Sequence, residues 1–171
     1  MSLSSLAWAV WYILPAYIAN ASPVLVGGGR PMDMGRKWRD GKRILGDGKT
    51  WRGFFGGVAI GTIFGAFQYL VTPSFYGGSF KTAISLAFLL SLGALVGDLV
   101  GSFFKRRAGL PRGYPAIGLD QLGFLIAALA FAYPVKTIGP GQMIFLLIFT
   151  PFLHWGTNYA AYRLGKKEVP W

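Results

Sequence analysis

Five long apolar runs constrain this chain of 171 residues more than any other feature. A helix that crosses the hydrocarbon core of a bilayer needs about 20 predominantly apolar residues. Only 13% of the residues are charged, about half of the roughly 25% found in soluble domains. We therefore expect an all-α, polytopic membrane protein whose residues 1–171 form a single domain. Its five predicted transmembrane helices cover residues 3–26, 54–71, 82–104, 117–135 and 143–162.

Basic residues lie almost entirely on one side of these predicted spans. The segment 27–53 contains eight Lys and Arg residues, the segment 105–116 four and the C-terminal segment three, against Lys81 and Lys136 on the other side. Cytoplasmic loops of membrane proteins carry such an excess of positive charge. We therefore expect residues 27–53 and 105–116 to form two large cytoplasmic loops. The C-terminus is then also cytoplasmic, and the N-terminus lies outside the cell membrane.

The net charge of +11 favours an anionic partner such as a lipid headgroup or a polyphosphate. Nucleic acid is disfavoured, because the basic residues lie in short loops close to the membrane. The chain has no cysteine and a single histidine, which excludes thiolate metal ligands and argues against a histidine-based zinc site. Acidic residues lie on the same side as the bases, a mixture that indicates a metal ion together with a polyphosphate. They are Asp33, Asp40, Asp47, Asp98, Asp120 and Glu168.

The sequence Gly-Asp-Gly-Lys-Thr at residues 46–50 is similar to the end of a phosphate-binding P-loop. A full Walker A motif needs a glycine five positions before Gly48, and that position is Arg43. A membrane-length apolar run follows instead of a soluble helix, so we reject a P-loop nucleotidase. The predicted second helix nevertheless begins just after this loop, and the N–H groups of a helix N-terminus form a natural phosphate site. Lys49 and Arg52 would add positive charge to that site.

Asp98, Ser102 and Lys105 fall on one face of the predicted third helix, because helix positions four and seven apart share a face. An ionised carboxylate at mid-bilayer costs about 2.5–3.5 kcal/mol. A salt bridge to an arginine of a neighbouring helix would satisfy Asp98 structurally. Asp120 begins the fourth span on the same side, where interaction with the helix dipole is the structural alternative. Two carboxylates at one depth predict a Mg²⁺ site, since Mg²⁺ takes one or two carboxylates together with phosphate oxygens.

Other small and polar residues of the spans have a structural interpretation. Gly61, Gly65 and Gly93 belong to rows of glycines four residues apart, which are typical of close helix packing in membranes. His154 and Asn158 share a face of the predicted fifth helix. We expect interhelical hydrogen bonding there, with a polar contact to a substrate as the alternative.

The segment "KTWRGFFGG" (residues 49–57) resembles the Lys-Thr-Trp-x-Gly-x-x-Gly-Gly segment of the CDP-diacylglycerol synthases. "GDLVGSFFKRRAG" followed by "PAIGLDQ" resembles their signature of a Gly-Asp, a Ser, a Lys-Arg pair and a later Leu-Asp. The chain is more similar still to the archaeal CDP-archaeol synthases, which have Gly-Asp-Gly-Lys-Thr in the first loop, Lys-Arg-Arg in the second and Asp-Gln at the end. It differs from the bacterial and eukaryotic enzymes by its shorter length and by Gln121 in place of an arginine.

This resemblance implies a CTP-dependent cytidylyltransferase that acts on a lipid phosphate within the bilayer. The implied substrate is 2,3-bis-O-geranylgeranylglycerol 1-phosphate, and the implied products are CDP-archaeol and pyrophosphate. Asp98 and Asp120 are implied to hold Mg²⁺. The implied catalytic residues are Asp98, Asp120, Lys105, Arg106 and Lys49. The residues implied in CTP and phosphate binding are Arg43, Gly46, Asp47, Gly48, Lys49, Thr50, Arg52, Ser102, Lys105 and Arg106.

Two other functions compete with this hypothesis. Asp40-Gly41-Lys42-Arg43 is similar to the start of the Asp-Gly-x-x-Ala-Arg motif of CDP-alcohol phosphotransferases, but the spacing differs and the two downstream aspartates are missing. An ion or proton transporter that uses Asp98 is the alternative from another class. Transporters place such groups near the midplane of the bilayer, whereas the ionisable residues of this chain cluster at the predicted inner face.

Overall fold

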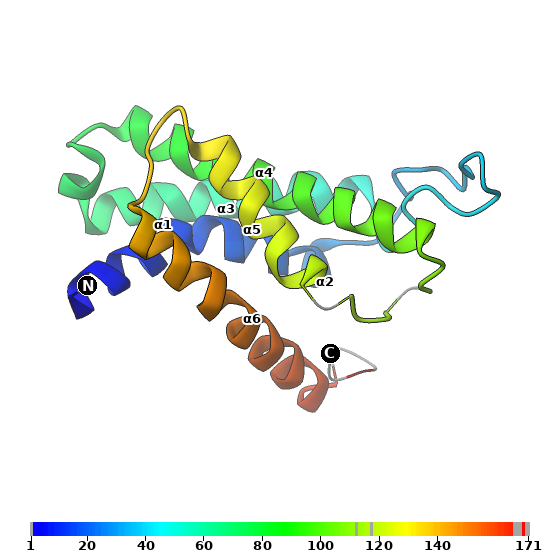
Figure 1. Ribbon diagram of the computed structural model, residues 1–171. Helices are drawn as coiled ribbons and strands as arrows, with labels where there is room; N and C mark the ends of the chain where they lie inside the picture. Colours follow the sequence, from blue (N-terminus) through cyan, green and yellow to red (C-terminus); the bar gives the residue numbers. More distant parts are fainter. Residues whose placement is uncertain (1, 112, 117, 166–168, 170–171) are drawn as a thin grey trace.

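The computed structural model describes residues 2–111, 113–116, 118–165 and 169. Within these residues the structure is helical, with two isolated β-bridges and no strand, which confirms the predicted all-α class (Figure 1). Predictions that involve Arg112, Ile117, Lys166, Lys167 and Glu168 lie outside the described residues. The helices are α1 (Leu3–Ala21), α2 (Pro23–Val26), α3 (Trp51–Val71), the 3₁₀ helix η1 (Pro73–Tyr76), α4 (Phe80–Arg107), α5 (Leu119–Ala132) and α6 (Pro140–Arg163).

Among the described residues, three helical segments are long and apolar enough to cross a membrane: Leu3–Val26, which combines α1 and α2, and the helices α3 and α4. The other two predicted spans stay predictions. Helix α5 has 14 residues and is therefore about 21 Å long, shorter than the roughly 30 Å of a hydrocarbon core. Helix α6 has 24 residues, but polar side chains such as His154 and Asn158 lower its hydropathy.

Helix α4 lies at the centre of the bundle and packs against α1, α3 and α5 (Figure 1). Its 28 residues give it a length of about 42 Å, so it extends beyond the apolar region into the charged loops. Lys105, Arg106 and Arg107 form its last turn, where cations interact favourably with the negative end of the helix dipole. Helix α6 packs on α1 and α5, and its C-terminal half diverges from the bundle in Figure 1.

Side-chain caps fix where α3 and α4 begin. The hydroxyl of Thr50 accepts a hydrogen bond from the N–H of Gly53 at 3.1 Å, and that of Ser79 accepts from Thr82 at 3.2 Å. These bonds satisfy donors that the first turn of a helix leaves without a partner. Helix α3 therefore begins at Trp51, earlier than residue 54, where the second apolar span was predicted to begin.

A buried glutamine connects α1 to α3 at the point where a proline interrupts α1. Pro15 has no N–H, so the carbonyl group of Trp11 loses its partner within the helix. The Gln68 side chain is fully buried on α3, and its Nε2 donates to that carbonyl at 2.6 Å. Its Oε1 accepts from the hydroxyl of Tyr76 at 3.0 Å. Both ends of the buried amide are thus satisfied, as buried polar groups usually are.

Close helix approach explains the rows of glycines. A Cβ atom at Gly61 would lie 2.7 Å from the carbonyl oxygen of Pro15 on α1. At Gly93 it would lie 2.7 Å from the carbonyl oxygen of Ala127 on α5, and at Gly65 it would overlap the Cβ atom of Ala87 on α4. The predicted packing role of these three glycines is therefore confirmed.

We expect Gly93→Ala to destabilise the protein by about 1–3 kcal/mol, the usual cost of forcing extra atoms into a packed interface. The added methyl group would meet the backbone of α5, which is not able to move aside as a flexible side chain would. Thermal unfolding in detergent measures the effect. Gly156→Ala on α6 is the matched control, because its Cβ would have nothing within 4 Å. Equal midpoints for the two variants would contradict the packing role.

Candidate active site

The two loops predicted to be cytoplasmic lie at one end of the bundle and contact each other (Figure 1). Arg107, at the end of α4, donates from Nη2 to the carbonyl oxygen of Arg43 at 2.5 Å, and its Nε lies 3.0 Å from Oδ2 of Asp40. Lys42 donates in return from Nζ to the carbonyl oxygen of Arg107 at 3.0 Å. The first loop is therefore held against the C-terminal end of α4.

The first loop is organised around the carboxylate of Asp33, whose side chain is fully buried. Its Oδ1 accepts from the N–H of Gly35 at 3.1 Å, and its Oδ2 accepts from the N–H groups of Leu45 and Gly46 at 3.0 and 2.9 Å. Arg43 donates to both oxygens, with Nη2 2.6 Å from Oδ1 and Nε 3.2 Å from Oδ2. One carboxylate thus determines the course of the loop.

These contacts shift the pKa values of both partners. Burial acts to raise the pKa of Asp33, but the guanidinium of Arg43 and the three N–H groups outweigh it and hold this pKa well below its ordinary range. Hydrogen bonds to Asp33 and then to Asp47 raise the pKa of Arg43. A carboxylate whose pKa is lowered by folding stabilises the folded state at every pH above its pKa in the unfolded chain, about 3.9. This stabilisation is lost as the pH falls toward and below its pKa in the folded protein. The loop therefore keeps its ion pair throughout the neutral range.

A cavity of about 600 Å³ lies between this loop and the end of α4. Its volume is within the range of about 300–1,000 Å³ that is typical of small-molecule sites. It brings together eight of the ten residues implied in CTP and phosphate binding, and these come from both loops and α4. They are Arg43, Gly46, Asp47, Gly48, Lys49, Ser102, Lys105 and Arg106.

Arg106 differs from the other cations around this cavity. Arg43, Lys49 and Lys105 each form an ion pair, and Lys42 donates to the carbonyl oxygen of Arg107, whereas Arg106 takes part in none of the ion pairs found among the described residues. Its Nε is buried and has no hydrogen-bond partner in the described part of the chain. A buried donor without a partner is costly, and a phosphate oxygen is a strong acceptor for a guanidinium. Arg106 is therefore suited to bind an anion in this cavity.

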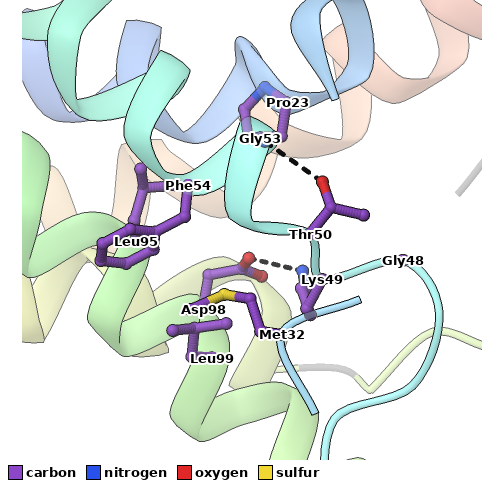
Figure 2. A pocket seen from close by; sticks show the side chains of 10 residues that line it. All are labelled: Pro23, Met32, Gly48, Lys49, Thr50, Gly53, Phe54, Leu95, Asp98 and Leu99. Carbon is purple, nitrogen blue, oxygen red and sulfur yellow. Dashed lines mark hydrogen bonds and ion pairs between the residues drawn. The ribbon is translucent and has the colours of Figure 1, made fainter. Parts of the chain in front are cut away.

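Lys49 and Asp98 form an ion pair at the start of α3. Figure 2 shows the two side chains pointing toward each other, and Nζ lies 2.5 Å from Oδ2. Apolar side chains of Phe54, Leu95 and Leu99 line the same small cavity of about 30 Å³. The salt-bridge alternative for Asp98 is thus realised with a lysine of the first loop, and not with an arginine of a neighbouring helix.

Lys105 and Asp120 form a second ion pair. Nζ of Lys105 donates to both carboxylate oxygens at 3.0 and 2.8 Å, and Oδ2 also accepts from the N–H of Ala116 at 2.9 Å. Asp98, Asp120 and Lys105 line a common cavity of about 170 Å³. Because Lys105 and Gly113 line this cavity and the larger one as well, the two adjoin.

The structure places two of the predicted binding residues outside both cavities. The hydroxyl of Thr50 caps α3, and Thr50 lines the small cavity beside Asp98. Arg52 is exposed on the first turn of α3. The local reason for Thr50 is the early start of α3 at Trp51, because the Thr50 hydroxyl then accepts from the N–H of Gly53 as the helix cap.

The carboxylates of Asp98 and Asp120 have the chemistry of a magnesium site. Each carboxylate already forms an ion pair with an ammonium group, Asp98 with Lys49 and Asp120 with Lys105. Mg²⁺ is usually bound by one or two carboxylates, with phosphate oxygens and water in the other positions. The described residues contain no cluster of three or more His, Cys, Asp or Glu side chains. The donor set therefore fits an ion that arrives with a polyphosphate better than one enclosed by protein ligands alone.

Sequence reasoning missed the roles of Asp33 and Asn20. Asp33 precedes Gly35 by two positions, the spacing of an Asx-turn, and this was the available signal. Asn20 lines the cavity of Asp98 and Asp120, and its only signal is a polar residue near the end of an apolar span. His154 and Asn158 line the same cavity and are joined within α6, with Asn158 Nδ2 3.0 Å from His154 Nδ1. Both interpretations of this pair, interhelical hydrogen bonding and a polar contact to a substrate, stay predictions.

Comparison with known proteins identifies the family. Residues 3–171 match the family model described as "CarS-like: CDP-archaeol synthase". The chain is 76% identical over 170 residues to the CDP-archaeol synthase of Thermococcus gammatolerans, with 99% of each chain covered. It is 67% identical to that of Pyrococcus horikoshii, with 100% of each covered. A solved structure described as "Structural insight into an intramembrane enzyme for archaeal membrane lipids biosynthesis" aligns with a TM-score of 0.80 and 40% identity, over 90% of this chain and 94% of that one. This chain belongs to the CDP-archaeol synthase family.

Proposed function

We propose that this chain transfers the cytidylyl group of CTP to a membrane lipid phosphate, 2,3-bis-O-geranylgeranylglycerol 1-phosphate, and releases CDP-archaeol and pyrophosphate. Its family membership supports this reaction over a CDP-alcohol phosphotransferase or an ion transporter. The main structural support for assigning this reaction to particular residues is the pair of adjoining cavities. The larger holds the loop cations and Arg106, the smaller holds Asp98 and Asp120, and Lys105 lines both.

The triphosphate of CTP would occupy the larger cavity. Arg106 offers a buried guanidinium N–H to a phosphate oxygen, and Lys49 and Lys105 line the same space. Charged hydrogen bonds are roughly twice as strong as neutral ones, and a phosphate oxygen carries charge as a carboxylate does. The triphosphate would therefore compete with Asp98 for the ammonium group of Lys49 and with Asp120 for that of Lys105. Lys49 would then move from Asp98 toward the nucleotide, and Lys105 from Asp120.

The lipid phosphate would bind in the smaller cavity. One of its oxygens attacks the α-phosphorus of CTP, a new P–O bond forms, and the bond from the α-phosphorus to the β-phosphate oxygen breaks. Pyrophosphate leaves with the electron pair of that bond. The second pKa of a phosphate monoester is about 6, so the attacking group is largely ionised at neutral pH and no general base is needed. The protein contributes alignment and neutralisation of charge, as in other phosphoryl transfers.

Asp98 and Asp120 would hold Mg²⁺, which supplies charge neutralisation at the phosphoryl oxygens when it is bound. Lys105 lies between the two cavities and would contact the phosphates of both substrates. Arg106 would orient the triphosphate next to Gly46, where a Cβ atom would lie 3.8 Å from Cδ of Arg106. Each of these residues contacts a reacting phosphate in this arrangement, which is why we assign them the catalytic roles.

We further propose that the N-terminus lies outside and that both loops and the C-terminus are cytoplasmic. The two loops meet at one end of the bundle, where most of the basic residues are found. Lys81 and Lys136 lie at the opposite end, next to η1, and Lys136 donates to the carbonyl oxygen of Phe75. This distribution supports the same orientation as the positive-inside rule, and it gives the site access to cytoplasmic CTP.

Calorimetry of the detergent-solubilised protein tests the proposed function. We expect CTP to bind at least about tenfold more tightly than ATP, GTP or UTP, a difference of about 1.4 kcal/mol. Chelation of Mg²⁺ should weaken CTP binding by a similar factor, because Asp98 and Asp120 would then repel the triphosphate. Turnover of the lipid phosphate to a CDP-lipid and pyrophosphate completes the test. If the protein is monodisperse and binds no nucleotide, the proposed function is wrong.

A further inference from the structure

A fourth cavity, of about 430 Å³, runs between α1, α2 and the C-terminal half of α6. We call it the apolar groove. Its lining is mostly hydrocarbon, with Val24 and Leu25 from α2, Phe124 from α5, and Leu153 and Ala161 from α6. The C-terminal half of α6, which lines the groove, diverges from the bundle in Figure 1. A large apolar cavity with a few polar groups at one end is the usual form of a site for an amphipathic ligand.

Three polar residues join the groove to the charged site. Asn20 of α1 and His154 and Asn158 of α6 line the groove and also the 170 Å³ cavity that contains Asp98 and Asp120. Asn158 Nδ2 lies 3.0 Å from His154 Nδ1 within this group. The path from the carboxylates to the hydrocarbon lining is therefore continuous, and it passes amide and imidazole groups.

We infer that the apolar groove binds one hydrocarbon chain of the lipid phosphate, and that Asn20, His154 and Asn158 contact the oxygens linking the chain to glycerol. The inference rests on the proposed function. A lipid phosphate whose headgroup lies beside Lys105 would reach the groove past these three residues, because they line both the smaller cavity and the groove. Ether oxygens are neutral acceptors, which suit neutral amide donors better than lysine or arginine.

The groove orients the substrate more than it increases affinity. A chain that enters from the bilayer exchanges one apolar surrounding for another, so the hydrophobic effect contributes little to its binding. Fixing the chain does restrict the position of the phosphate at its other end. Correct positioning of reacting groups contributes strongly to rate, so filling the groove should reduce turnover of long-chain substrate and leave CTP binding unaffected.

Ala161→Trp fills the groove with an indole ring, and Leu153→Trp does so from the previous turns of α6. The probes are a glycerol ether phosphate with two isoprenoid chains and an analogue with two short chains, both in detergent micelles. We expect Ala161→Trp to lower kcat/KM for the long-chain probe about tenfold and to leave the Kd for CTP within about twofold. Turnover of the short-chain analogue should match wild type. Ile148→Trp is the control, since Ile148 is exposed on α6 outside the groove.

The polar contact is tested separately with Asn158→Leu. The KM for the long-chain ether phosphate should rise about fivefold, the effect of one lost hydrogen bond, while kcat and the Kd for CTP change less than about twofold. A purely structural role would change the Kd for CTP or the thermal midpoint as well. An unchanged KM would overturn the assignment of these three residues.

The outcomes separate the groove from the proposed function. If wild type neither binds CTP nor converts the lipid, the proposed function fails. If wild type converts the long-chain probe and both tryptophan variants do so equally well, the groove assignment alone fails. If a tryptophan variant instead changes the molar mass in light scattering and leaves lipid kinetics unchanged, a second copy of the chain occupies the groove and the inference is overturned.

Discussion

Asp98→Asn is expected to leave a folded protein whose kcat is about a thousandfold lower, because a transition-state contribution of about 4 kcal/mol equals three factors of ten at 1.36 kcal/mol each. Asparagine has the shape of aspartate, so the contacts of α4 with its neighbours persist. What is lost is the charge, and with it one of the two carboxylates at the proposed magnesium site. A bound metal ion typically contributes several kcal/mol of charge stabilisation to such a transfer.

Single-turnover formation of CDP-lipid from labelled CTP measures this effect without interference from product release. Asp40→Asn is the matched control. It removes the same charge from the same end of the bundle, but Asp40 pairs with Arg107 and lines neither the 600 Å³ nor the 170 Å³ cavity. We expect a change below about threefold for Asp40→Asn, because asparagine keeps an oxygen acceptor for the partly buried Arg107 and the residue lines neither cavity. Full activity of Asp98→Asn would exclude the metal role.

A double-mutant cycle separates the metal role of Asp98 from its ion pair with Lys49. If Asp98 only holds Lys49 in place, then Lys49→Met and the double variant should be as slow as Asp98→Asn, since residues that act through one contact are non-additive. If Asp98 binds the metal and Lys49 the nucleotide, the double variant should be slower than either single variant. We expect the second result, because Lys49 lines the larger cavity and Asp98 the smaller.

The sequence was sufficient to predict the long helices because their signals are local. The segment predicted at 3–26 coincides with Leu3–Val26, and the glycines of α3 and α4 pack as expected from their spacing. The start of α3 was placed too late, since a hydropathy pattern ends where apolar residues end, whereas a helix begins at its cap, here Thr50. The fourth span was predicted over 117–135, and the helix there, Leu119–Ala132, is shorter.

The sequence was sufficient to predict which residues form the candidate site, but not which of them form ion pairs with one another. Residue type and spacing placed Asp98, Asp120, Lys105 and Arg106 at one end of the bundle, and these residues line the two adjoining cavities. Which lysine pairs with which carboxylate depends on how a loop folds over a helix end. That long-range contact leaves no periodic signal in the sequence. The buried role of Asp33 was missed for a different reason: its spacing from Gly35 indicates an Asx-turn, but it does not show that Arg43, Leu45 and Gly46 donate to the same carboxylate.

Asp33→Asn is the second large effect that we expect, with a loss of CTP affinity of about a hundredfold. The Asp33 carboxylate accepts from Arg43 and from three backbone N–H groups while fully buried. An amide in its place loses the charge and turns one acceptor into a donor that faces those donors. Breaking a buried pair in this way typically costs about 3–5 kcal/mol.

This cost falls on the loop and not on the helices, because the bonds of Asp33 all lie within residues 33–46. The loop should therefore populate its CTP-competent form only rarely, and the apparent Kd rises by the inverse of that population. Calorimetry gives the Kd, and hydrogen exchange of residues 30–49 reports the loss of order. The thermal midpoint of the bundle should change little.

Asp47→Asn is the matched comparison for Asp33→Asn, since Asp47 pairs with the same guanidinium of Arg43 but is 65% exposed. An exposed ion pair contributes about 0–1 kcal/mol, so the Kd for CTP should rise less than about fivefold. The pKa of Asp33 is held far below neutral, so wild-type binding should show no Asp33 titration between pH 5 and 8, the range in which a carboxylate of depressed pKa stays ionised. Equal Kd values for the two variants would show that loop order depends on Arg43 charge pairing alone, and not on the buried hydrogen bonds of Asp33.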